Sequence, residues 1–209
     1  MKDLPEPSRV ENAGQQQDKL LDFQTINDIP ARYRNHPRFN ELINDPAHNG
    51  DYPRKVLCEA MSALEAELSG KIKGPVTRSD TAYIDFYDGD GYPFDVKTPP
   101  SPKPGDKWEF SAYSVADTIL EQLDKTHPNK FTKKEEPVAV LLDTTFMTNR
   151  DLLELRRELR RRTKEDRSVL KRVFEVNVKL DSAREQTKDS GKKSLSPGQL
   201  LAMRQNLGR

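Results

Sequence analysis

The sequence predicts an α/β domain in which a mixed β-sheet is flanked by helices. Three observations support this class. Residues 55–69, and the segment that begins at Asn149, repeat apolar side chains at helical spacing. Residues 81–98 contain two short strand patterns around the tight turn Asp88–Gly91, DGDG. Residues 138–142, VAVLL, form the continuous apolar run of a strand buried on both faces. Such alternation of helices and strands builds a layered α/β domain.

Length and composition set the domain organisation. The 209 residues are enough for one domain with tails. We predict an N-terminal helical or partly disordered segment over 1–50, the α/β domain over 51–180, and a polar, mobile tail over 181–209. The net charge is only +1, so any affinity for nucleic acid must come from a local patch. Cys58 is the single cysteine, which excludes an internal disulfide and argues against a cysteine-based zinc site.

The opening residues lack the apolar core of a secretory signal. No apolar run in the sequence approaches the roughly 20 residues that a membrane span needs. We therefore expect a soluble chain.

Residues 55–69 carry the first strong helix pattern, and Gly70 ends it. Its apolar stripe consists of Leu57, Met61, Leu64 and Leu68. At about 100° per residue, Glu65 and Glu67 lie on the two shoulders of that stripe. Glu59 lies on the opposite side, where we expect it to face solvent. The shoulder glutamates are thus the acids expected to reach the surface on which the helix packs.

The predicted hairpin joins a strand at Thr81–Phe86 to a return strand at Tyr92–Thr98, and Pro99 stops the second strand. The elements that follow are a helix at Ser114–Leu123, the strand at Val138–Leu142, the helix from Asn149, a strand at Arg172–Leu180 and a short helix at Pro197–Asn206. The helix from Asn149 has an outer face dense in arginine, and glutamates alternate with these arginines. We interpret this face as a solvated, salt-bridged surface rather than a phosphate-binding one.

Asp85, Asp95 and Lys97 are the residues in this hairpin that indicate chemistry. Asp95 and Lys97 leave the same face of one strand, and the turn brings Asp85 across from them. Converging carboxylates are costly unless a cation lies between them, and hard oxygen ligands suit Mg²⁺ or Mn²⁺. A neighbouring lysine can orient or deprotonate water and stabilise charge on a phosphate. The alternative from the residues alone is an ordinary solvated strand face with a cross-strand ion pair.

Residues 74–99, GPVTRSDTAYIDFYDGDGYPFDVKTP, resemble the PD-(D/E)xK nuclease superfamily. More narrowly, they resemble the C-terminal toxin domains of bacterial contact-dependent growth inhibition and related polymorphic toxin systems. LLDTTFM, residues 141–147, is similar to a later strand of that group. The resemblance extends from about Glu59 to Arg160 and is dense only over 74–99. It implies a restriction-endonuclease-like core and a metal-dependent endonuclease that cuts DNA or tRNA.

By position, the resemblance implies that Asp85 and Asp95 are metal ligands and that Lys97 is the catalytic lysine. Glu67 would be the helix acid and third metal ligand, with Glu65 as its rival. The metal would be Mg²⁺ or Mn²⁺, with zinc as an alternative. One departure is Ile84, which stands where the superfamily name places proline; Asp80 is a second choice for the first aspartate.

The resemblance also implies partners and a route. A dedicated immunity protein would silence the domain, and a secreted or cell-surface carrier would deliver it into the cytoplasm of a target cell. A different hypothesis keeps the same fold without catalysis, as a nucleic-acid-binding or partner-binding module.

Further residues are secondary candidates for the site. Asp143 and Thr145 follow the buried strand at 138–142, and Thr98 ends the strand of Asp95. Trp108 lies in a loop with cations and can stack on a nucleotide or simply pack. The residues predicted to bind nucleic acid are Arg78, Lys103 and Lys107.

Overall fold

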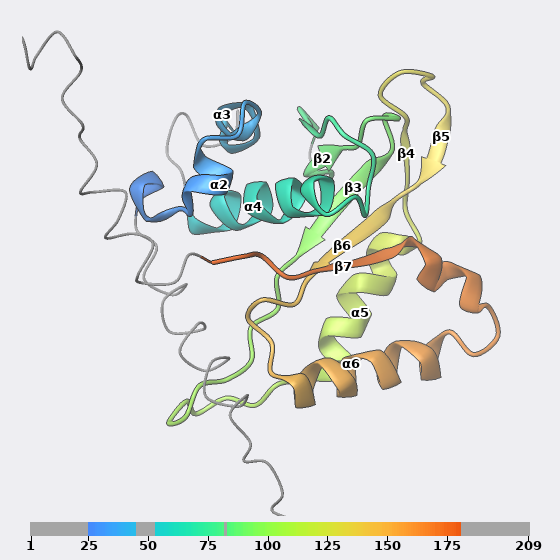
Figure 1. The fold of residues 1–209 in the computed structure, drawn as a ribbon. Helices are drawn as coiled ribbons and strands as arrows, with labels where there is room; N and C mark the ends of the chain where they lie inside the picture. Colours follow the sequence, from blue (N-terminus) through green and yellow to red (C-terminus); the bar gives the residue numbers. More distant parts are fainter. Residues whose placement is uncertain (1–24, 45–52, 82, 181–209) are drawn as a thin grey trace, which may run out of the picture. The chain divides into compact units, whose positions relative to one another are not determined.

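A five-stranded mixed sheet, with strand order β1-β2-β3-β6-β7, lies at the centre of the domain (Figure 1). The computed structural model describes residues 25–44, 53–81 and 83–180. The predictions for residues 1–24, for the loop at 45–52 and for the tail at 181–209, including the helix at 197–206, lie outside the described residues. Every element named below belongs to the unit formed by Met1–Lys179.

The strands are β1 (Thr77–Arg78), β2 (Phe86–Tyr87), β3 (Pro93–Lys97), β6 (Ala139–Asp143) and β7 (Val173–Val176). The pairs β1–β2 and β2–β3 are antiparallel, whereas β3–β6 and β6–β7 are parallel. The prediction of a mixed sheet flanked by helices is therefore confirmed. A separate antiparallel pair joins β4 (Thr126–Pro128) to β5 (Glu135–Pro137).

Helix α4 (Arg54–Leu68) covers one face of the sheet and is itself covered. The short helices η1 (Ile26–Asp28), α2 (Ala31–Arg34) and α3 (Phe39–Ile43) precede it, and α2 and α3 pack on its outer side. Tyr33 and Phe39 are fully buried there. All residues of α4 from 56 to 66 are consequently buried, not only one stripe. The described residues 25–44 thus pack as part of the domain that we had expected to begin at residue 51.

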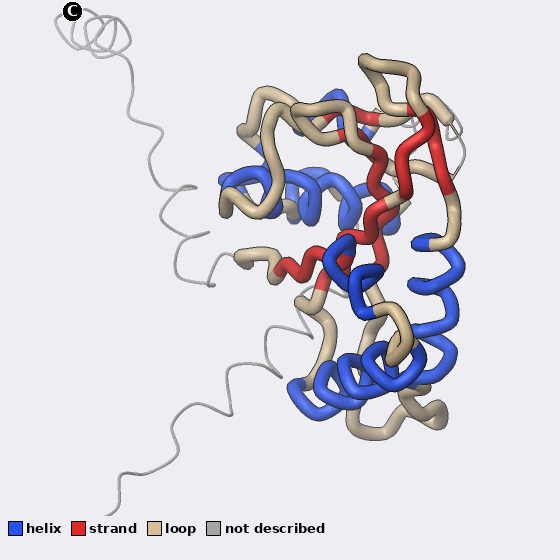
Figure 2. The backbone as a smooth tube through the Cα atoms, turned by 90° about the vertical axis from the view of Figure 1, so that its right-hand side faces the viewer, coloured by secondary structure: helices blue, strands red, loops and turns tan. Residues whose placement is uncertain are grey.

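Helices α5 (Ala112–Leu123) and α6 (Asn149–Arg162) cover the opposite face, so that strands lie between two helical layers (Figure 2). Their shared core consists of Ala116, Ile119, Leu123, Val140, Leu142, Met147, Leu155 and Leu159. The 3-10 helix η3 (Arg167–Arg172) leads into β7. Val140 and Leu142 point toward this layer, and side chains alternate along a strand. Asp143 accordingly points the other way and meets Ser62 of α4.

None of the described helices has the length and apolar character needed to cross a membrane.

The predicted local structure differs from the observed one in two respects. In the region where a strand was expected at 81–86, residues 83–85 belong to no strand, and only Phe86–Tyr87 pair with β3. The backbone bends there because Tyr83 adopts a left-handed φ of 77° and the Ser79 N–H bonds to the Asp85 carbonyl. The strands β1, β4 and β5 were not predicted. Each has two or three residues, and β4 and β5 contain proline, so none shows the alternation on which strand prediction depends.

Candidate functional site

Asp85 is fixed by the backbone of β3 immediately before β2 begins. Its N–H donates to the Phe94 carbonyl over 2.9 Å, and its carboxylate Oδ2 accepts the Val96 N–H over 2.7 Å. The side chain therefore occupies the place of the next acceptor in the β2–β3 ladder. Because Asp95 lies between Phe94 and Val96, this pairing brings the two aspartates together as the hairpin predicted.

Asp95 and Lys97 form an ion pair along one face of β3. The Lys97 Nζ lies 2.7 Å from Asp95 Oδ2, and the side chains are 25% and 8% exposed. Strand β3 is paired on both sides, by β2 and by β6, so its backbone holds both groups in a fixed position. The Lys97 side chain is therefore partly exposed to solvent, whereas its partner Asp95 is buried.

Glu59 is the helix acid that reaches this site, and the prediction that it faces solvent was wrong. It is 4% exposed. Its Oε2 pairs with Arg78 Nη1 at 3.2 Å and its Oε1 with Lys55 Nζ at 3.3 Å. The helical wheel failed because it assumed a solvated outer side, whereas α4 is surrounded by packed elements.

The charge of Asp85 acts on both Glu59 and Asp95, and we call these three residues the carboxylate cluster. Burial, and then the charge of Asp85, raise the pKa of Glu59. Burial raises the pKa of Asp95 to about 6, and the charge of Asp85 acts in the same direction against the opposing effect of Lys97. Burial also raises the pKa of Asp85 itself. Carboxyl pKa values raised by burial and by a neighbouring carboxylate are found both at functional sites and in structural ion-pair networks.

Two of these carboxylates, Glu59 and Asp95, are paired with basic side chains. Within the described part of the chain, no group of three or more His, Cys, Asp or Glu side chains stands ready to hold a metal ion. Glu59 Oε1 and Asp95 Oδ2 are nevertheless buried without a hydrogen bond, and each has a lysine ammonium as its neighbour. Buried oxygens of this type are what a divalent cation satisfies. The donor set of hard oxygens therefore fits Mg²⁺ or Mn²⁺, provided that the lysines move aside.

The two glutamates predicted as helix ligands are committed to other contacts. Glu67 Oε2 accepts the Val76 N–H at 2.8 Å and so holds the segment before β1. Glu65 accepts the Tyr33 hydroxyl at 2.7 Å and pairs with Arg32 at 3.0 Å. Glu67 therefore binds the segment before β1, and Glu65 binds residues of α2. In this structure neither glutamate is among the charges that dominate at Asp85 or Asp95.

Asp143 and Thr145 belong to a network of hydrogen bonds between α4 and the end of β6. Asp143 is 1% exposed, and its Oδ2 accepts the Ser62 hydroxyl at 2.9 Å. Its Oδ1 accepts the Thr145 N–H at 2.9 Å and also the Thr145 hydroxyl. Thr145 Oγ1 in turn accepts the Val178 N–H at 2.7 Å. These bonds tie α4, the end of β6 and the residues after β7 to one another.

The remaining predicted residues divide by exposure. Arg78 was predicted to bind nucleic acid, but its side chain is only 11% exposed. Its guanidinium forms an ion pair with Glu59 and presents little charge to solvent. Thr98 directly follows β3 and is half-buried. Lys107 is exposed, Lys103 is partly exposed, and Trp108 is 45% exposed on the loop between β3 and α5. The loop that carries these side chains follows Lys97 directly along the chain.

Comparisons with protein-family models, with characterised proteins and with solved structures found no match to this chain.

Proposed function

We propose that this chain is a metal-dependent nuclease whose centre consists of Glu59, Asp85, Asp95 and Lys97. One observation carries the proposal. The charge of Asp85 acts on both Glu59 and Asp95, which come from a helix and a strand far apart in sequence. A fold that serves only stability has no need to bury three carboxylates whose charges are linked in this way, because each raised pKa costs free energy at neutral pH.

The residues divide the chemistry among themselves. Glu59, Asp85 and Asp95 would hold a divalent cation, which supplies an activated water and a contact to a phosphoryl oxygen. Lys97 lies beside Asp95 and is partly exposed, so its ammonium is suited to orient the attacking water and to stabilise negative charge on the phosphate. Arg78 holds Glu59 in place from the buried side. The substrate class is DNA or RNA, with tRNA among the RNA substrates.

The finer assignment rests on the resemblance of residues 74–99 to PD-(D/E)xK toxin domains. We propose that the core is restriction-endonuclease-like, and the order of α4, the antiparallel β1-β2-β3 and the parallel β6 supports this proposal. We propose that the chain acts as the toxic domain of an interbacterial competition system and that an immunity protein covers the carboxylate cluster.

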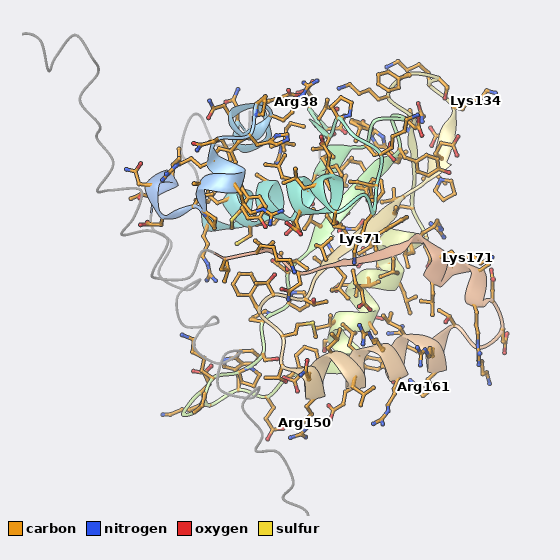
Figure 3. The ribbon with its side chains drawn as sticks, viewed as in Figure 1. Arg38, Lys71, Lys134, Arg150, Arg161 and Lys171 are labelled. Carbon is orange, nitrogen blue, oxygen red and sulfur yellow. The ribbon has the colours of Figure 1, made fainter. Side chains whose placement is uncertain are left out.

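A digest tests the nuclease. The purified chain is incubated with duplex DNA, single-stranded DNA and tRNA, with Mg²⁺, Mn²⁺ or a chelator. We expect cleavage that the chelator abolishes, and loss of cleavage in Lys97→Ala with an unchanged circular dichroism spectrum. Lys171→Ala is the matched control, because Lys171 is exposed on η3 (Figure 3). A folded chain that cuts none of the substrates with either metal refutes the proposal.

A second function is favoured by the ion pairs themselves. Because Lys55 and Arg78 already neutralise Glu59, and Lys97 neutralises Asp95, the site can also be a closed polar cluster on a non-catalytic binding module. Calorimetric titration with Mn²⁺ separates the two functions. Heat that disappears in Asp95→Asn supports the nuclease, and no heat in the unaltered chain supports the module.

A further inference from the structure

Lys55 is a solvent-exposed cation that lies over the carboxylate cluster. It is the second residue of α4, and its Nζ lies 3.3 Å from Glu59 Oε1, one helical turn further along. The lysine side chain is 78% exposed, whereas that of Glu59 is 4% exposed. The ion pair thus joins an exposed cation to a buried carboxylate.

The charges of all three carboxylates act on Lys55. Glu59 acts most strongly to raise the pKa of Lys55, and Asp85 and Asp95 act in the same direction against the opposing effect of burial. The other two cations are less accessible, since Arg78 is 11% exposed and Lys97 is 25% exposed. Lys55 is therefore the most exposed of the three cations.

The start of α4 is unusually positive. Its first two residues are Arg54 and Lys55, and its first turn contains no acidic residue. Helix N-termini already carry partial positive charge and normally favour acidic side chains. Two cations at this end cost some helix stability, and the arrangement attracts anions toward the edge of the site.

We infer that Lys55 binds a phosphate group of the substrate strand next to the bond that is cut. This inference rests on the proposed nuclease. A divalent cation among the carboxylates would repel the ammonium from Glu59, since both cannot share Oε1. The long, exposed lysine side chain then turns toward the nearest anion at little cost, and in a bound nucleic acid that anion is a phosphate. In the metal-free protein Lys55 accordingly pairs with Glu59, and in the protein with metal and nucleic acid bound it would contact a substrate phosphate.

Two measurements without cleavage test the inference. Ca²⁺ affinity is measured by calorimetry, and binding of labelled single-stranded and duplex oligonucleotides is measured by fluorescence anisotropy in Ca²⁺ over a range of salt. Lys55→Gln removes a competing cation, so we expect Ca²⁺ to bind more tightly, by about 2-fold or more. The same variant should bind oligonucleotide about 3- to 10-fold more weakly, with a salt slope reduced by about 0.7–0.9, the value of one phosphate contact. Lys55→Arg keeps the charge and should keep the slope.

Arg150→Gln is the matched control. Arg150 is also the second residue of its helix, is 83% exposed, and pairs with Glu154 at i+4 over 3.2 Å, but it lies on α6 (Figure 3). It should change neither affinity.

The inference is overturned if Lys55→Gln matches the unaltered chain in both measurements, or if Arg150→Gln loses oligonucleotide affinity equally. A chain that cuts nucleic acid while Lys55→Gln binds normally overturns only the role of Lys55. A chain that binds neither Ca²⁺ nor oligonucleotide overturns both proposals.

Discussion

The Lys97 ammonium lies 2.7 Å from Oδ2 of Asp95, on the same face of β3, yet the pKa of Asp95 is raised to about 6. Burial, with repulsion from Asp85, outweighs the attraction of the lysine. The site therefore stores an unfavourable charge in the metal-free protein. That charge makes Asp95 costly for stability and well suited to hold a cation.

Asp95→Asn should stabilise the metal-free protein at neutral pH. A carboxyl whose pKa is raised by folding binds its proton more tightly when folded, so stability falls as pH rises from about 4 to about 6. Raising the pKa of Asp95 from its ordinary value of about 4 to about 6 corresponds to roughly 3 kcal/mol, part of which is lost because Lys97 loses its partner. We expect Asp95→Asn to be about 1–2 kcal/mol more stable at pH 8 and equal at pH 4. Urea unfolding with a chelator measures this, and a less stable variant at pH 8 contradicts it.

Glu59→Gln and Glu67→Ala should separate the two helix acids. Glu59 lies within the field of Asp85, so Glu59→Gln should weaken Mn²⁺ binding about 10-fold or more. Glu67→Ala instead leaves the Val76 N–H without its acceptor, which costs about 1–3 kcal/mol of stability and should leave Mn²⁺ affinity within about 2-fold. Calorimetry and urea unfolding measure the two effects. The reverse pattern would restore Glu67 as the metal ligand.

Ser62→Ala should destabilise the fold without altering the metal centre. Asp143 is 1% exposed and loses one of its three hydrogen-bond donor groups in this variant. A buried carboxylate deprived of a donor costs about 1–3 kcal/mol. Ser69→Ala, at the residue that caps the C-terminus of α4, removes a hydroxyl that bonds to the Glu65 and Ala66 carbonyls of the helix and should cost less. Thermal unfolding and Mn²⁺ titration test both. Equal losses in the two variants would mean that Asp143 does not depend on Ser62.

Gly89→Ala should disrupt the turn that aligns β2 with β3. A Cβ at Gly89 would lie 2.1 Å from the Gly74 carbonyl oxygen, and the Gly89 N–H donates to the Lys73 carbonyl over 2.7 Å. The backbones must separate, at a cost of about 2 kcal/mol or more. Gly70→Ala is the control, because Gly70 has open space around it and only its φ of 69° opposes a side chain, a penalty of about 1 kcal/mol. Urea unfolding compares the two. A smaller loss at Gly89 than at Gly70 would contradict the close approach.

The local pattern of apolar residues was sufficient to predict the helices and strands that bury one face or both faces completely. The helices at α5 and α6 and the strands β3 and β6 appeared near their predicted places because spacing of apolar residues depends on the element alone. The pairing of Asp95 with Lys97 followed from the period of a strand for the same reason. The hairpin turn also placed Asp85 near Asp95, although Asp85 precedes β2 rather than lying within it.

The sequence by itself determined the α/β class and the strand that carries Asp95 and Lys97. Tertiary structure alone decided which acid of α4 joins them. A helical wheel ranks positions by one buried face, and α2 and α3 cover the other side of α4, so Glu59 is buried where solvent was expected. Apart from Lys55 on the same helix, the charges that act on Glu59 come from Arg78 and Asp85, which are 19 and 26 residues further along the chain. Contacts at such separations are set by packing between elements and leave no trace in local periodicity.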